Sequence, residues 1–292
     1  MKGKTVTPAI YALLAAVLYA LSTPVSKFLM TEIPPSFLAG ILYLGAGLGM
    51  MPVCLIKRKT TSFRKIEKAD IPYITGMVAL DIAAPVFLMI ALSNTSAANI
   101  SLINNFEIVA TSLIAFVIFK EKISGKLWLG IILITVSCLL LSFEGLESLS
   151  FSTYSVFAFL ACIAWGFENN CTRKLSDLAP SKTVMIKGIG SGTGAILVSF
   201  LLREKIHLSS YVFIALILGF VAYGLSVFLY VSAQRVLGAA RTSSYYAIAP
   251  FIGALLSIVL LRELPPITFY VAFAIMSFGM ILVTKDNSNT HK

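Results

Sequence analysis

The sequence predicts an all-α integral membrane protein with ten transmembrane helices, arranged as two five-helix inverted repeats. Three observations predict this fold: an apolar composition, a series of apolar runs of membrane-spanning length, and a similarity between the two halves of the chain. Of the 292 residues, 58% are hydrophobic and 12% are charged, and the mean hydropathy is +0.91. A soluble domain of this length needs a more charged surface, so the composition favours a membrane protein.

The apolar runs define the expected helices in chain order. A helix needs about 20 apolar residues to cross the hydrocarbon core of a bilayer. Most connections between the runs are short, so neighbouring helices should pack antiparallel, without an inserted soluble domain. Pro24, Pro85 and Pro250 fall within runs, where each removes a helical hydrogen bond and should act as a kink or a hinge. We expect helices over residues 8–29, 35–56, 70–92, 96–119, 127–144, 153–173, 181–202, 210–233, 239–261 and 266–284.

Positive charge is distributed unevenly between the two sides of the expected bundle. The net charge is +10, but Lys and Arg form short clusters between apolar runs and no continuous basic face. This pattern favours membrane orientation over nucleic-acid binding. With the N-terminus inside, the inner segments hold the cluster at 57–68 and most other basic residues, while the outer loops hold only Arg203, Lys205 and Arg262. The positive-inside rule then predicts a multi-pass plasma (inner) membrane protein with both termini cytoplasmic and a polar cytoplasmic tail at 285–292.

An internal repeat divides the chain into two halves, 1–144 and 145–284. A shift of 142 residues aligns identical side chains, and a shift of 146 residues aligns a second set. Each half then holds five spans, and an odd number forces the two copies into opposite orientations across the membrane. Inverted repeats of this kind recur in secondary transporters. The aligned pairs are Ser101 with Ser243, Leu113 with Leu255, Glu121 with Glu263, Tyr19 with Trp165, Lys27 with Arg173 and Pro34 with Pro180.

Two segments carry a family resemblance. Thr95–Ser142, which begins TSAANISLINNFEIVATSLIAFVIFKEKIS, resembles the hallmark of the EamA family in the drug/metabolite transporter superfamily. Gly238–Thr284, which begins GAARTSSYYAIAPFIGALLSIVLLRE, resembles its second copy. The resemblance implies ten helices, cytoplasmic termini and a central cavity. The proline usual in the first copy is Ile108 here, whereas the second copy keeps Pro250, so the first repeat is expected to lack that kink.

Five ionisable residues lie well inside the expected spans. A charge in hydrocarbon costs roughly 2.5 to over 10 kcal/mol, so each of these residues needs a cavity or a partner. The acids are candidates for binding a positively charged group of a solute or for carrying a coupling proton. The alternative is that they only join helices, with the carboxylates paired to the basic residues. The five residues are Asp81, Glu107, Glu168, Lys187 and Arg241.

Polar and aromatic residues recur at helical spacing near these charges. Asn104 and Glu107 share one face of the fourth span, and Trp165, Glu168 and Asn169 share a face of the sixth. We expect such stripes to converge on one aqueous cavity, although packing roles would also explain individual aromatic residues. The aromatic rings could hold a ring or a cation. The predicted substrate-binding residues are Glu107, Glu168, Asn104, Asn105, Asn169, Trp165, Tyr19, Tyr223, Tyr245 and Tyr246.

The glycine-rich run at 187–194 does not match a phosphate-binding loop. Its lysine precedes the glycines, and no strand comes before it. The glycines are spaced as overlapping GxxxG pairs, which predicts close helix packing. The four cysteines lie in apolar runs without CxxC spacing, so we interpret them as buried small hydrophobes and expect no metal site.

These features predict a secondary transporter of a small organic metabolite such as an amino acid, an amine or a nucleobase-like solute. Alternating access, export and proton coupling are expected from the resemblance and the buried acids. A facilitative exchanger or a channel for small cations is the alternative. An intramembrane enzyme is disfavoured because His207 and His291 lie in a loop and the tail, and Asp81 is the only aspartate well inside a span. The expected partners are the solute and the lipid bilayer, without cofactor or nucleic acid, for a monomer or homodimer.

Overall fold

A computed structural model describes residues 3–57, 64–119, 124–142, 152–175, 178–206, 209–237, 242, 245–262 and 265–287 of the chain. Within these ranges every regular element is a helix. The elements are α1 (Gly3–Ala20), α2 (Ser22–Leu29), α3 (Pro35–Lys57), η1 (Lys68–Asp70), α4 (Ile71–Asn94), α5 (Ala97–Ile103), α6 (Phe106–Phe119), α7 (Gly125–Ser142), α8 (Thr153–Lys174), α9 (Pro180–Leu201), α10 (Tyr211–Leu218), η2 (Gly219–Leu225), α11 (Ser226–Leu237), α13 (Ala249–Leu261) and α14 (Ile267–Asn287).

The helices match the apolar runs of the sequence closely. Six segments are long and apolar enough to cross a membrane, and three shorter apolar helices accompany them at Gly125–Leu141, Ala249–Leu261 and Ile267–Leu282. The all-helical fold is therefore confirmed for the described residues, and six segments have the length and composition of membrane spans. The total of ten spans stays a prediction. The six longer segments are Pro8–Leu29, Pro35–Ile56, Lys68–Asn94, Ala97–Ile114, Pro180–Leu201 and Tyr211–Ala233.

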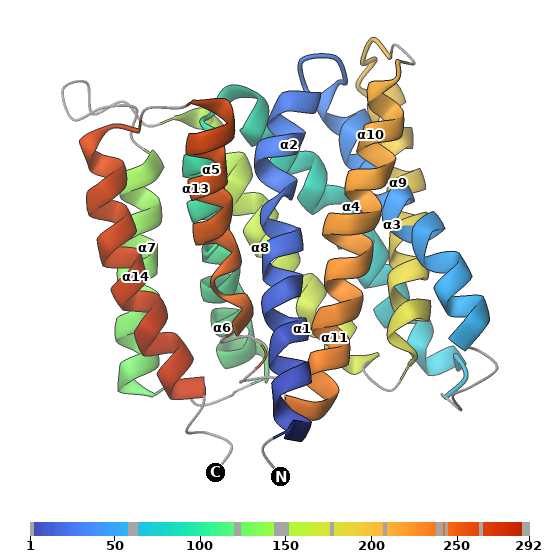
Figure 1. The fold of residues 1–292 in the computed structure, drawn as a ribbon, viewed down its shortest axis with the longest axis horizontal. Coiled ribbons are helices and arrows are strands. Elements are labelled where there is room, and N and C mark those ends of the chain that lie inside the picture. Colours follow the sequence, from blue (N-terminus) through green and yellow to red (C-terminus); the bar gives the residue numbers. More distant parts are fainter. Residues whose placement is uncertain are drawn as a thin grey trace.

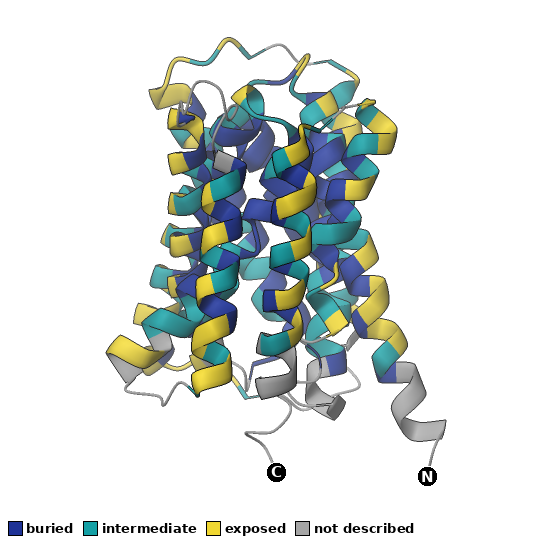
Figure 2. Ribbon diagram, turned by 90° about the vertical axis from the view of Figure 1, so that its left-hand side faces the viewer, coloured by how far each residue is buried: buried dark blue, intermediate teal, exposed yellow. Residues whose placement is uncertain are grey.

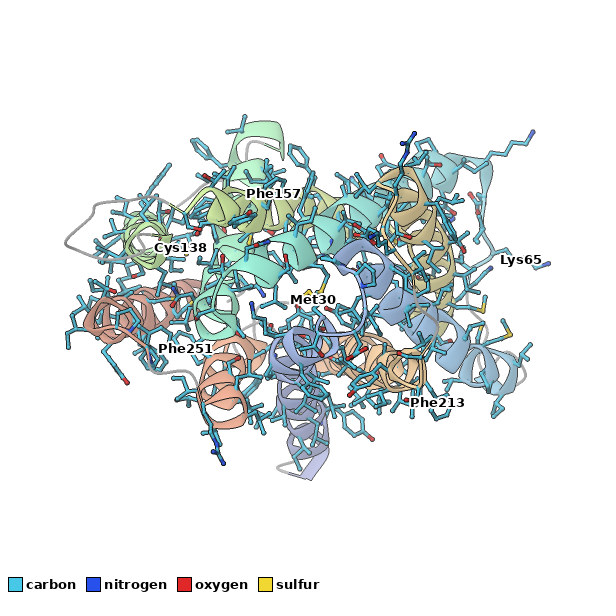
Figure 3. All side chains as sticks on the ribbon, turned by 90° about the horizontal axis from the view of Figure 1, so that it is seen from above. Met30, Lys65, Cys138, Phe157, Phe213 and Phe251 are labelled. Atoms are coloured by element: carbon cyan, nitrogen blue, oxygen red, sulfur yellow. The ribbon has the colours of Figure 1, made fainter. Side chains whose placement is uncertain are left out.

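The helices run side by side along one direction, with α1 beginning and α14 ending at the same end of the bundle (Figure 1). The closest packing joins α3 to α9, α4 to α8, α7 to α14 and α1 to α11. Exposed residues lie mainly on the outward faces of the helices and buried residues face inward (Figure 2). Seen from above, Lys65 reaches out at the periphery while Met30 lies near the middle (Figure 3).

Glycines of α9 allow two neighbouring helices to approach closely. A Cβ added at Gly188 would lie 2.3 Å from the Gly47 nitrogen of α3, and one at Gly192 would lie 2.6 Å from the Leu44 nitrogen. Gly190 and Gly194 instead face side chains of α4. The overlapping GxxxG pairs therefore pack against two different helices, which confirms the predicted packing role.

Several apolar runs contain a local change in the helix. The first is interrupted at Leu21, and Pro24 three residues later has no N–H to donate to the Ala20 carbonyl. The eighth predicted run contains the seven-residue π-helix η2. By contrast, α4 continues through Pro85 from Ile71 to Asn94.

The expectation that the first repeat lacks a kink was wrong. Residues 104 and 105 form a turn between α5 and α6, although position 108 carries isoleucine. Both the backbone N–H and the side-chain amide of Asn105 donate to the Leu102 carbonyl, at 3.0 and 3.1 Å. Asparagine side chains compete for backbone hydrogen bonds in this way, so two adjacent asparagines interrupt the helix without a proline.

Candidate functional site

A lysine joined to two carboxylates lies in the interior of the bundle. The Lys187 ammonium of α9 is 3.0 Å from Asp81 Oδ2 of α4 and 3.0 Å from Glu168 Oε2 of α8. The Asp81 contact is an ion pair without the alignment of a hydrogen bond. Asp81 and Glu168 are 0% and 1% exposed, and the Lys187 side chain is 18% exposed. Because buried charges are costly when unpaired, the three groups stabilise one another in this arrangement.

Hydroxyl groups complete this cluster. The Tyr43 hydroxyl of α3 donates to Asp81 Oδ1 at 3.2 Å, and the Thr172 hydroxyl donates to Glu168 Oε1. The indole N–H of Trp165 lies within reach of the Tyr43 hydroxyl. The polar stripe on α8 therefore faces inward, as its spacing predicted.

Tyr43 is a site residue that the sequence analysis missed. It lies in an apolar run and has no charged neighbour at helical spacing, so the run gives no polar stripe. The glycines two and four positions after it, Gly45 and Gly47, mark the close approach of other helices. A tyrosine beside such glycines was the available signal, because its hydroxyl needs a partner when buried.

A third acid lies where α6 begins. Glu107 is in the first turn of α6, directly after the interruption at 104–105. Asn169 of α8 donates its side-chain amide to Glu107 Oε1 at 2.8 Å and to the Thr111 hydroxyl at 3.4 Å. The positive end of the α6 dipole stabilises the carboxylate.

Tyrosine rings form a continuous series beside these acids. Tyr43 lies 5.3 Å from Tyr223, Tyr223 lies 5.8 Å from Tyr19, and Tyr19 lies 5.8 Å from Tyr246 between ring centroids. Tyr246 continues to Tyr230 at 4.9 Å. Glu107 is within electrostatic range of Tyr19 and Tyr246. Predicted residues from both halves of the chain thus meet through aromatic contacts.

A small cavity of about 10 Å³ adjoins the tyrosines. This volume is about that of one water-sized particle. Tyr19 and Asn104 are the predicted binding residues that line it, while the acids occupy the paired contacts described above. The polar stripes therefore lie in adjacent networks, and the expected single aqueous cavity remains a prediction. The full lining is Tyr19, Ala20, Thr23, Ser101, Asn104, Ala249, Pro250 and Gly253.

Some predicted residues have other surroundings. Asn105 is 1% exposed, and its side-chain amide donates to the Leu102 carbonyl and to Met276 Sδ of α14. Tyr245 is 40% exposed. Side chains of adjacent residues in a helical turn point in directions about 100° apart, so when Tyr246 points inward Tyr245 points outward. The structure therefore does not bring Tyr245 into the buried cluster.

Arg241 lies outside the described residues. Lys27 binds the carbonyls of Leu92 and Thr95 at the end of α4.

The described residues contain no cluster of three or more His, Cys, Asp or Glu side chains that could hold a metal ion. Their buried charged and aromatic groups instead lie in an apolar helical bundle. This combination defines a membrane protein with a polar interior, the class that includes transporters of small solutes.

Comparison with known proteins identifies the family. The model of the EamA-like transporter family matches residues 6–143 and again residues 152–285, so the chain belongs to this family. A protein of Methanothermobacter thermautotrophicus (strain Delta H), described as an "Uncharacterized transporter", is 24% identical over 268 residues, which are 85% of this chain and 78% of that protein. The chain is therefore a membrane transporter of the drug/metabolite type, which acts on a small-molecule solute within a lipid bilayer, and the family points away from an enzyme.

A solved structure supports the same fold. It is described only as "Crystal structure of protein" and covers 96% of this chain and 97% of its own length, with a TM-score of 0.71. The sequence identity is 15%, so the likeness concerns the arrangement of the helices alone.

Proposed function

We propose that this transporter moves a small organic metabolite by alternating access, with Glu107 and Glu168 as the acids on which transport depends. The observation that carries the proposal is that each acid binds across the two halves of the chain. Glu107 of the first half accepts from Asn169 of the second. Glu168 of the second half shares Lys187 with Asp81 of the first.

If residues 1–144 and 145–284 form two inverted five-helix repeats, these contacts join the two units whose conformations exchange during transport. The two separate matches to the family model support the division. So does a turn at 247–248 in the second half, because the 142-residue shift relates Asn105 of the first interruption to Ala247. Exchanging the conformations of two inverted repeats converts a cavity open to one side into a cavity open to the other.

The charge distribution supports cytoplasmic termini in the plasma (inner) membrane. Lys65 and Lys68 lie between α3 and α4, and Lys182 begins α9, at the end of the bundle where α1 begins and α14 ends (Figure 1). Arg203 and Arg262 follow α9 and α13 at the opposite end. The positive-inside rule assigns the lysine-bearing end to the cytoplasm.

The chemistry of the interior favours a solute with a positive or polar group. Three carboxylates, from Asp81, Glu107 and Glu168, share one ammonium among the described residues of the two networks. A cationic amine, the ammonium of an amino acid or a proton would balance the remaining charge, and the amides and rings suit a nucleobase-like solute as well. Export driven by the solute gradient or by a proton gradient fits this arrangement.

Charge-neutral substitutions test the proposal. Purified Glu107→Gln and Glu168→Gln proteins, reconstituted in vesicles, should each lose solute counterflow or its pH dependence. The glutamine keeps the size of the side chain but removes the charge and the exchangeable proton. Glu32→Gln is the matched control, because Glu32 is exposed outside the bundle interior and should transport as the wild type does.

Flux that saturates and shows counterflow supports a carrier, whereas single-channel current would support a channel. Unchanged, pH-dependent counterflow in both acid variants would contradict the assigned role of the two acids.

A further inference from the structure

The small cavity lies where three interrupted helical segments meet. Tyr19, Ala20 and Thr23 come from the interruption between α1 and α2, and Asn104 from the one between α5 and α6. Gly253 comes from the first turns of α13, after the turn at 247–248. Both halves of the chain therefore contribute to a space of about 10 Å³.

Two residues that line this cavity carry buried oxygens without partners. Ser101 Oγ and Asn104 Oδ1 have no hydrogen-bond partner among the described residues, and the two residues are only 2% and 7% exposed. An unpaired buried polar atom costs roughly 1–3 kcal/mol. Two such atoms beside one water-sized space indicate a binding site for a small ligand that hydrogen-bonds to, or is coordinated by, oxygen atoms of the protein.

A backbone carbonyl faces the same space. A Cβ added at Gly253 would lie 3.1 Å from Ser101 Oγ and 3.3 Å from the Ala20 carbonyl oxygen. Pro24, four residues after Ala20, cannot donate to that carbonyl as a helical residue would. The absent side chain of Gly253 therefore leaves room between two oxygens that come from different helices.

The oxygen atoms around the cavity, rather than the helix dipoles, favour a cation. α1 ends at Ala20 and α5 ends at Ile103, but α2, α6 and α13 begin at Ser22, Phe106 and Ala249, so the opposite ends of these dipoles offset one another. Carbonyls at interrupted helices coordinate alkali cations in transporters with such helices. The carboxylate of Glu107 lies three residues beyond Asn104 and within electrostatic range of Tyr19, which adds negative potential.

We infer that this cavity is a binding site for one dehydrated sodium ion, held by Ser101 Oγ, Asn104 Oδ1 and the Ala20 carbonyl. Its neutral oxygens suit a hard monovalent cation. Calcium requires more ligands and carboxylates, and transition metals prefer nitrogen or sulfur. A water molecule is the competing occupant, because the Ser101 hydroxyl can donate to it while the water donates to Asn104 Oδ1 and the Ala20 carbonyl, so sodium binding itself must be measured.

The ion supplies a coupling mechanism, and this role rests on the proposed transport function. The three oxygens belong to α1, α5 and the interruption that follows α5, while Gly253 of α13 belongs to the second half. All three oxygens belong to the first half, so a rearrangement of the halves would carry α13 away from them, open the site to water and release the ion. Sodium binding would then favour one orientation of the transporter over the other.

Binding of radioactive sodium to the purified protein tests the site without any transport. The wild type should bind about one sodium ion per chain saturably, and potassium should compete weakly because the cavity is small. Ser101→Ala removes one ligand with little change in volume. Gly253→Ala places a methyl group among the oxygens. Each should weaken sodium affinity at least about tenfold, the change that ~1.4 kcal/mol represents.

Gly279→Ala is the matched control. Its added Cβ would meet Leu133 Cβ at 3.0 Å and the Gly130 carbonyl at 3.2 Å, a similar crowding in α14 without unpaired oxygens. This variant should bind sodium as the wild type does. Absence of saturable sodium binding to the wild type would overturn the inference and leave a site for water only. Equal affinity in the wild type and Ser101→Ala would overturn it as well.

Solute counterflow separates this inference from the proposed function. If sodium does not bind while counterflow persists, the site is wrong and the transporter proposal stands. If sodium binds but Glu107→Gln and Glu168→Gln leave counterflow and its pH dependence unchanged, the site stands and the role proposed for the acids fails. If sodium binds and counterflow is the same in sodium and potassium, the coupling role is wrong.

Discussion

Replacing Gly188 by alanine should disrupt the contact between α3 and α9. The added Cβ would lie 2.3 Å from the Gly47 nitrogen, 2.5 Å from its Cα and 2.7 Å from the Tyr43 carbonyl oxygen. All three neighbours are backbone atoms, so no side-chain rotation can relieve the overlap. An ordinary contact begins near 3.4 Å, and the difference of 1.1 Å (3.4 minus 2.3) must come from moving one helix away from the other.

This displacement affects both stability and the polar network. Overpacking a close contact costs about 1–3 kcal/mol and more where the backbone must move, so we expect about 3 kcal/mol for Gly188→Ala. Lys187 precedes Gly188, and Tyr43 supplies one of the clashing atoms. The contacts of both residues with Asp81, at 3.0 and 3.2 Å, should therefore lengthen as α3 and α9 separate.

Thermal unfolding in detergent, with solute counterflow as the second measurement, checks this prediction. Gly190→Ala is the matched control on the same helix, because the three atoms nearest to its Cβ all belong to the Val78 side chain, the two methyl groups at 3.0 and 3.1 Å and Cβ at 3.7 Å. A side chain can yield by a few tenths of an ångström, so this variant should lose less than about 1 kcal/mol. Gly188→Ala should unfold at a clearly lower temperature and lose counterflow. Indistinguishable unfolding temperatures for the two variants would refute the argument from backbone contact.

Two further predictions concern partly buried lysines. Lys187→Met should destabilise the fold by about 3–5 kcal/mol, because it leaves the carboxylates of Asp81 and Glu168 facing each other without a cation. Adding Asp81→Asn to this variant should restore part of the unfolding temperature. A double variant no more stable than the single one would count against the ion pair. Lys27→Met should lower stability by about 1–2 kcal/mol in the same unfolding assay, because it removes the charged donor from the last carbonyls of α4. An unchanged unfolding temperature for Lys27→Met would show that water replaces the ammonium there.

Local patterns in the sequence determined the helices and their polar faces. Hydrophobic length located the spans, and spacings of three and four residues put Trp165, Glu168 and Asn169 on one face of α8. The same reasoning identified the glycines of α9 as packing contacts. These inferences succeed because the geometry of a helix relates residues within two turns of one another, whatever surrounds the helix.

The tertiary structure alone decided which polar groups meet. Lys187 joins Asp81 and Glu168 because the glycines of α9 bring that helix close to α3 and α4 and set the level at which the lysine lies. The inward position of Tyr43 and the outward position of Tyr245 depend likewise on how each helix is rotated against its neighbours. A sequence of one chain specifies a helix and its faces locally, but the rotation and vertical register of each helix arise only from side chains that pack across the bundle.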